Sequence, residues 1–151
     1  MTNKPLAIVT AAEQDQISRL LLQWLNQYPD KPLTAINYEY LDEGVPNMAL
    51  SSVIQGAYKT KIYILGGYEA EYNFKLIYRT QPGNSNNNRL KAAELLDAFG
   101  DWITANCRKL NLGSNIRTVK IEPNARSSFF ARYENGDEDY QILMTLTYEV
   151  I

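Results

Sequence analysis

Residues 68–79 read YEAEYNFKLIYR, and this stretch decides the fold. Successive side chains of a β-strand point to opposite faces of the sheet, and here apolar and polar side chains alternate. One face would carry Tyr68, Ala70, Tyr72, Phe74, Leu76 and Tyr78, and the other would carry Glu69, Glu71, Asn73, Lys75 and Arg79. The pattern predicts a strand with one face in the core and the other in solvent.

The segment that follows predicts a helix over 89–107, reached through the polar loop 81–88. Its apolar residues recur at helical spacing and would form one stripe: Ala92, Leu95, Leu96, Phe99, Trp102 and Ile103. The loop lacks the glycine pattern and the Lys-Ser/Thr ending of a phosphate-binding loop, so we expect a connector in which Ser85 or an Asn caps the helix. The helix would pack its stripe on the apolar face of the strand.

The first half of the chain predicts a helix and then strands. Thr10 can cap a helix with Glu13 in its first turn, and Pro29 would stop that helix. The helix stripe would be Ile17, Leu20, Leu21, Trp24, Leu25 and Tyr28. Residues 33–41 predict a strand, 42–47 a loop, and 57–65 a strand that forms a hairpin with 68–79 through Gly66-Gly67. Residues 48–56 fit either a helical turn or irregular chain.

The last third of the chain predicts three strands, over 116–122, 127–134 and 140–151, with an Asn135-Gly136 turn before the last. The expected order is α-β-β-β-α-β-β-β. This is an α+β fold in which two main helices pack on an antiparallel sheet. A chain of 151 residues has the usual size of one domain, so we expect a single domain over 1–151.

Composition excludes several classes of protein. The net charge of −2 provides no basic field for nucleic acid, and the absence of His excludes a His-based triad and an ordinary zinc site. Cys107 is the single cysteine, which excludes an internal disulfide, and it lies on the apolar side of its helix as a core residue. No apolar run is long enough for a signal peptide or a membrane span, so we expect a soluble protein without cofactor or metal. The 11 tyrosines suit half-buried strands, or alternatively protein contacts.

Besides Asp42 with Glu43, acidic residues form two groups, Glu69 with Glu71, and Asp137 with Glu138 and Asp139. A hydrolase with paired carboxylates needs two such groups that converge in a cleft. Here one group alternates along the polar face of a strand and the other lies in a turn, so we expect solvated charges. The turn also lacks the spacing of an EF-hand. We therefore expect a protein that is not an enzyme.

The element order, with the strand 67–79, the helix 89–103 and the closing segment 139–149, resembles the tail terminator and minor capsid (head–tail joining) proteins of long-tailed bacteriophages. The resemblance spans nearly the whole chain. It implies a hexameric ring that caps the tail tube, ends its polymerisation and docks to the head connector. The implied partners are identical subunits, the tail tube protein and a head-completion protein, with DNA passing through the lumen without specific binding. The implied location is the virion, and the host cytoplasm during assembly.

Projecting polar segments are the candidates for subunit interfaces or for the lumen of such a ring. They are the loop 42–47 and the residues Asn84, Asn86, Asn87, Asp137, Glu138, Asp139, Glu69 and Glu71. An acidic hairpin that faces the lumen would repel passing DNA and ease its transit. Two other interpretations stay open. The first is a head-completion or stopper protein of the same neck. The second is an enzyme that handles a small ligand, which would need an enclosed pocket with convergent polar groups.

Overall fold

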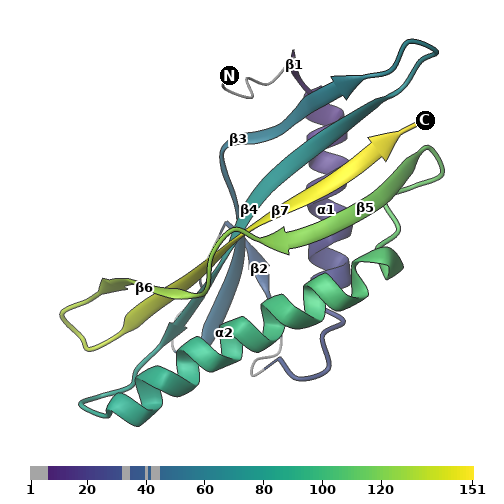
Figure 1. Cartoon of the computed structure of the whole chain (residues 1–151). Coiled ribbons are helices and arrows are strands. Elements are labelled where there is room, and N and C mark those ends of the chain that lie inside the picture. Colours follow the sequence, from purple (N-terminus) through teal and green to yellow (C-terminus); the bar gives the residue numbers. More distant parts are fainter. Residues whose placement is uncertain (1–6, 32–34, 40, 42–44) are drawn as a thin grey trace.

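The computed structural model describes residues 7–31, 35–39, 41 and 45–151 (Figure 1). The elements in chain order are β1 (Ala7–Ile8), α1 (Ala11–Leu25), β2 (Asn37–Tyr38), β3 (Asn47–Ile62), β4 (Tyr68–Thr80), α2 (Asn86–Asn106), the short 3₁₀ helix η1 (Cys107–Lys109), β5 (Ile116–Pro123), β6 (Ser128–Arg132) and β7 (Glu138–Val150). The α+β fold and the expected order are confirmed, with a short β1 added in front of the first helix.

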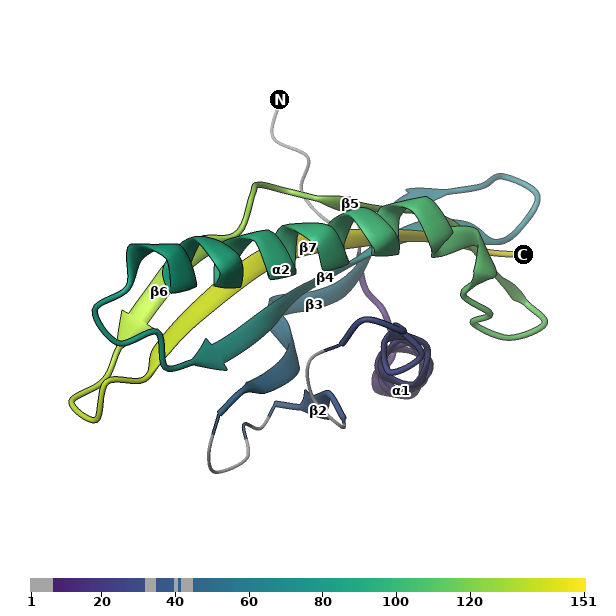
Figure 2. The ribbon, with the colours of Figure 1, turned by 90° about the horizontal axis from the view of Figure 1, so that it is seen from below.

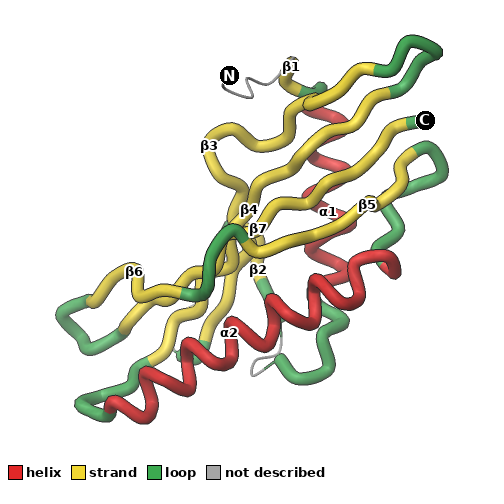
Figure 3. The backbone as a smooth tube through the Cα atoms, viewed as in Figure 1, coloured by secondary structure: helices red, strands yellow, loops and turns green. Residues whose placement is uncertain are grey.

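Among the described residues, seven strands form one sheet, with β4 and β7 at its centre. These two strands pair antiparallel along their whole length, from Tyr68 opposite Val150 to Thr80 opposite Glu138. The other edge of β7 pairs with two strands. The strand β5 pairs with the C-terminal half of β7, and β6 pairs with the N-terminal half of β7. On the far side of β4 lies β3, which also holds β1 antiparallel and β2 parallel (Figure 3).

Both helices pack on the same face of the sheet, because their buried residues belong to one core with the inward-facing residues of β4 and β7. Figure 2 shows α1 nearly end-on. The ring of Trp24 on α1 stacks on that of Trp102 on α2, with centroids 4.9 Å apart, and Tyr28 stacks on Phe99 at 4.3 Å. The residues of β4 and β7 on this face are buried: Ala70, Tyr72, Phe74, Leu76, Tyr78, Tyr140, Ile142, Met144, Leu146 and Tyr148. The expected alternation in β4 is confirmed from Ala70 to Tyr78, whereas Tyr68 is only half-buried. The opposite face of β4 and β7 is covered by neither helix.

Polar groups of α1 fasten it to the sheet. The Tyr148 hydroxyl donates to a carboxylate oxygen of Glu13 at 2.6 Å, and the Tyr68 hydroxyl donates to the other oxygen. The hydroxyls of Ser18 and Tyr72 lie 2.7 Å apart in the core. Thr10 accepts the Glu13 backbone N–H as the expected cap, but the Glu13 side chain binds the sheet instead of completing a capping box.

The strand β3 begins at Asn47, so residues 48–56, which the sequence left ambiguous, belong to a strand. Met48 and Leu50 face the helices, while Ala49 on the other face is also buried, beside Glu39 and Leu41. The Glu39 carboxylate accepts hydrogen bonds from the Ser51 and Ser52 hydroxyls and from the Ser52 backbone. A strand buried on both faces shows no alternation, which is why the sequence pattern did not reveal it.

A bulge divides β3 into two halves. Ser52 pairs with Phe74 and Ala57 pairs with Tyr72, so Asn73 of β4 has no partner in the β3 ladder. Gly56 within the bulge has a φ of +57°, and the Ala57 N–H is bound by the Gln14 side chain of α1 at 3.2 Å. A bulge bends its strand away from the neighbour, and the tube in Figure 3 follows this bend.

Two further boundaries differ from the sequence prediction. The strand expected over 33–41 is reduced to β2, and its residues 33, 34 and 40 lie outside the described residues, as do 42–44 of the expected loop. Helix α2 begins at Asn86 instead of Arg89, because Ser85 accepts the Asn88 N–H at 3.2 Å and so caps it earlier. Cys107 is buried, as expected. None of the described helices combines the length and the apolarity that a membrane crossing requires.

Candidate functional site

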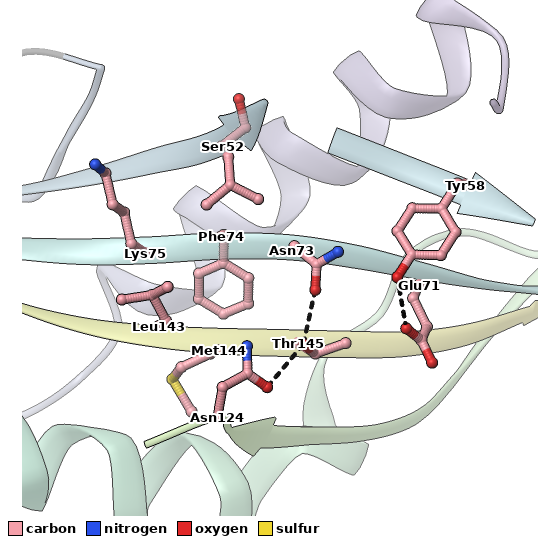
Figure 4. A pocket seen from close by; sticks show the side chains of 11 residues that line it. Ser52, Tyr58, Glu71, Asn73, Phe74, Lys75, Asn124, Leu143, Met144 and Thr145 are labelled. Atoms are coloured by element: carbon pink, nitrogen blue, oxygen red, sulfur yellow. Dashed lines mark hydrogen bonds between the residues drawn. The ribbon is translucent and has the colours of Figure 1, made fainter. Parts of the chain in front are cut away.

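The uncovered face of the sheet is hollowed beside the bulge of β3 (Figure 4). The hollow has a volume of about 720 Å³ and is lined by Ser52, Val53, Tyr58, Glu71, Asn73, Phe74, Lys75, Asn124, Leu143, Met144 and Thr145. It forms where β3 leaves the ladder opposite Asn73. The candidate Glu71 therefore lies in this hollow, and Glu69 lies further along the same face of β4.

The polar groups of the hollow are bound to one another. The Tyr58 hydroxyl donates to Glu71 at 3.0 Å, and the Thr145 hydroxyl lies 2.8 Å from Asn73 Oδ1 and 3.1 Å from Asn124 Oδ1. Burial raises the pKa of Tyr58, so its phenol stays protonated at neutral pH. Two lining hydroxyls, those of Ser52 and Tyr58, donate to the Glu39 and Glu71 carboxylates, so these polar groups already have hydrogen-bond partners. The arrangement suits a surface that receives another group better than one that performs a reaction.

Glu138 and Asp139 do not project from the hairpin as solvated charges, and that expectation was wrong. Both begin strand β7, and each is only 2% exposed. Asp139 accepts two hydrogen bonds from the Arg79 guanidinium, at 2.7 and 2.9 Å, and one from the Tyr133 hydroxyl at 2.7 Å. A buried carboxylate requires such partners, because without them its desolvation would oppose folding.

Glu138 is held by partners from three elements. Its carboxylate accepts from Arg132 of β6 and Tyr140 of β7, both at 2.8 Å, and from Arg89 of α2 at 3.2 Å. Burial acts to raise the pKa of Glu138, but the hydrogen bonds from Arg89, Tyr140 and Arg132 outweigh it and leave that pKa below its ordinary value. Burial, together with the neighbouring Glu138 carboxylate, raises the pKa of Tyr140 to about 12. The Glu138 carboxylate therefore joins α2 to the sheet through Arg89, whereas Asp139 forms its ion pair within the sheet, with Arg79 of β4.

Six of the eight sequence candidates lie at one end of the molecule. The Gln81 side chain donates to the Asn135 carbonyl at 2.8 Å, which places the β4–α2 loop beside the β6–β7 turn. This end contains Asn84, Asn86, Asn87, Asp137, Glu138 and Asp139. The three asparagines are exposed, and Asn86 and Asn87 belong to the first turn of α2 instead of a loop. Asp137 forms no ion pair with any described residue. Glu69 and Glu71 lie apart from this group.

The sequence analysis missed the exposed apolar residues at the two ends of the sheet. Ile62, Ile64 and Leu65 lie at the tip of the β3–β4 hairpin, and Phe129, Phe130 and Tyr133 lie on and beside β6. The two groups are at opposite ends in Figure 1. The signal was present in the first case, because Ile64 and Leu65 directly precede Gly66-Gly67, where a turn was expected.

The outer edges of β5 and β6 are also unoccupied. Within the described part of the chain, both strands pair only with β7, so their other edges carry backbone groups without a strand partner. Such edges are templates for strand addition by another chain. Both edge strands and both apolar ends are therefore surfaces on which protein partners can assemble.

Comparison with known proteins gives a likeness of fold. No protein-family model matches the chain, and no curated protein matches it in sequence. A chain of the virion of a native gene transfer agent particle has a similar structure, with a TM-score of 0.52 and 16% sequence identity over 90% of this chain and 93% of that one. A second solved chain aligns over 95% of this chain with a TM-score of 0.39 and 12% identity. At 16% identity, the first match shows a shared fold.

Proposed function

We propose that this protein is a structural subunit of a phage-like virion, which forms a hexameric ring at the head-proximal end of a tail tube. The ring would end the polymerisation of the tube and dock to the head connector. The observation that carries the proposal is the fold likeness to a gene transfer agent virion chain, which extends over 90% of this chain. The sequence resemblance to tail terminators supports the proposed position in the particle.

The surfaces of the molecule support an assembly role. A ring subunit needs two different contact surfaces, one for each neighbour, and further surfaces for the tube and the connector. The open edges of β5 and β6 and the apolar groups at both ends of the sheet provide candidates of the required kind. The hollow on the open face, in contrast, holds groups that are already bound to one another, which does not favour an enzyme.

Within this proposal, the acidic charge near the lumen comes from fewer residues than the sequence suggested. Glu138 and Asp139 are neutralised by arginines, so Asp137 and the exposed Glu134 are the acidic groups of the β6–β7 turn that DNA could meet. We expect the variant Asp137→Asn with Glu134→Gln to slow DNA ejection from assembled particles. Unchanged ejection kinetics would contradict a lumenal position of this turn.

The experiment that tests the proposed function is deletion of the gene from the genome that encodes the particle, followed by electron microscopy of the lysate. Loss of a tail terminator should yield filled heads without tails and tubes of uncontrolled length. Loss of a stopper or head-completion protein should instead yield tails of normal length beside heads that have lost DNA. Complete infectious or transducing particles would overturn both structural roles.

A further inference from the structure

The turn at the tip of the β3–β4 hairpin, residues 63–67, carries apolar side chains that the fold of one chain does not use. Ile64 and Leu65 are fully exposed (101% and 100%), and Ile62 beside them is largely exposed. The turn itself depends on Gly66 and Gly67, both with positive φ, and on the hydrogen bond from the Tyr63 N–H to the Gly67 carbonyl. The turn chemistry therefore does not require apolar residues at 64 and 65.

Other turns of the same sheet show the ordinary composition. Residues 81–85 read QPGNS, and residues 133–137 read YENGD. Both contain the polar residues and glycine that turns favour. The tip at 63–67 differs from them because it presents two adjacent aliphatic side chains to solvent at the end of a projecting hairpin (Figure 1). Contiguous exposed apolar side chains of this kind mark a contact with another molecule.

The hollow on the open face has the properties needed to receive this tip. Leu143 and Val53 contribute an apolar wall, and a volume of about 720 Å³ exceeds that of two aliphatic side chains. The rim is extended by Phe130, whose ring centroid lies 5.2 Å from the Lys75 ammonium (Figure 4 shows Lys75). The hollow therefore combines an apolar surface with polar groups at its margin.

One charged residue on each surface offers a pairing of opposite sign, although Lys75 also lines the hollow and Glu69 lies opposite Lys61 in the ladder. Lys61 is exposed next to the tip and forms no ion pair with any described residue. Glu71 lines the hollow, where the neutral Tyr58 hydroxyl is its hydrogen-bond donor. Lys61, entering with the tip of the next copy, can reach the Glu71 carboxylate. Among the described residues, Glu71 has no cationic partner. This pairing would fix the orientation of the tip more than it would add affinity.

We propose that the β3–β4 tip of one copy of this chain seats in the open-face hollow of the next copy. Ile64 and Leu65 contact Leu143 and Val53, and Lys61 faces Glu71. The inference rests on the proposed ring function. The tip cannot fill the hollow of its own chain. The tip is the end of the paired β3–β4 hairpin, and the hollow lies beside the bulge in the middle of the same hairpin. The contact is therefore head-to-tail, and such contacts repeat around a closed ring or along a filament.

Disulfide trapping between two variants, each with one introduced cysteine beside the native Cys107, tests this contact. Protein carrying Leu65→Cys is mixed with protein carrying Leu143→Cys, oxidised, and analysed by non-reducing electrophoresis. The native Cys107 is buried, so wild-type protein serves as the blank. Protein carrying Leu90→Cys replaces the hollow variant in the control, because Leu90 is exposed and belongs to α2, which contributes no residue to the lining of the hollow. We expect at least a fivefold higher yield of the 65–143 dimer than of the 65–90 dimer.

The double variant Leu65→Cys with Leu143→Cys tests whether the head-to-tail contacts close into a ring of six subunits. We expect a ladder of cross-linked species that ends at six subunits. A ladder without a limit at six would support the contact but count against the hexameric ring. Rings visible by electron microscopy, with the 65–143 yield no higher than the control, would overturn the contact while leaving the ring function intact. A yield no higher than the control in protein that forms no rings also overturns the contact.

Discussion

Replacing Glu138 by glutamine tests whether this carboxylate is the centre of a buried ion-pair cluster, as the structure has it, or a surface charge. The substitution keeps the size of the side chain but removes its negative charge. Charge-assisted hydrogen bonds are worth about 1.5–3 kcal/mol each in protein mutants. Because Arg89 and Arg132 retain side-chain exposures of 30% and 58%, both guanidinium groups can recover solvent, which reduces the cost.

We therefore expect Glu138→Gln to lower the free energy of unfolding by about 2 kcal/mol at pH 7. For a chain of this size, that loss corresponds to a fall in Tm of about 4–8 °C. Glu134→Gln is the matched control, because Glu134 is exposed in the same hairpin and forms no ion pair with a described residue. A surface substitution of that kind should change stability by less than about 0.5 kcal/mol. Urea denaturation followed by circular dichroism measures both variants.

The pH dependence supplies a second test of the same assignment. The pKa of Glu138 is lower in the folded protein than in the unfolded chain, where it is near 4.5. The unfolded state therefore binds the proton more readily, and the stabilisation by the carboxylate is present above pH 4.5 and is lost as the pH falls through the folded pKa. The difference between wild type and Glu138→Gln should shrink below pH 4.5. A difference that grows on acidification, or one equal to that of Glu134→Gln at pH 7, would refute the reasoning.

The remaining predictions concern the contacts that hold the sheet and helices together. Gly67→Ala should cost about 2 kcal/mol, because its φ is +81° and an added Cβ would lie 2.4 Å from the Val150 carbonyl oxygen, whereas Gly66→Ala should cost less because nothing lies within 4 Å. Tyr148→Phe should cost about 1.5 kcal/mol through the lost hydrogen bond to Glu13. Ser85→Ala should cost about 1 kcal/mol, because it removes the cap of α2. Urea denaturation measures each cost, and equal values for the two glycine variants would contradict the proposed clash.

The sequence could predict those strands that have one face in the core and the other face in solvent. In β4 the helices cover one face and solvent meets the other, so its alternation carried over directly into burial. The first half of β3 is covered on both faces, partly by residues distant in the chain such as Glu39, and no local pattern records that. The bulge at 52–57 likewise depends on Gln14 of α1.

The candidate site was less accessible to sequence analysis, because pairing between distant residues decides whether a charge is free. Asp139 and Arg79 are adjacent in the β4–β7 register but sixty positions apart in the sequence. Without that register, three consecutive acidic residues after a turn indicate a solvated hairpin. The hollow has the same origin, since it exists only where β3 leaves β4. The apolar turn at Ile64 and Leu65 could have been found, had the residues before Gly66 been assigned to the turn.

The mass of the purified protein in solution, measured by sedimentation equilibrium and followed by electron microscopy of the larger species, tests the central claim most directly. One chain has a mass of 17.2 kDa. The account predicts a species of six chains that appears in micrographs as a ring with an open lumen, either from the protein alone or after addition of the tail tube protein. A protein that remains monomeric at high concentration and in the presence of tail tubes would contradict it.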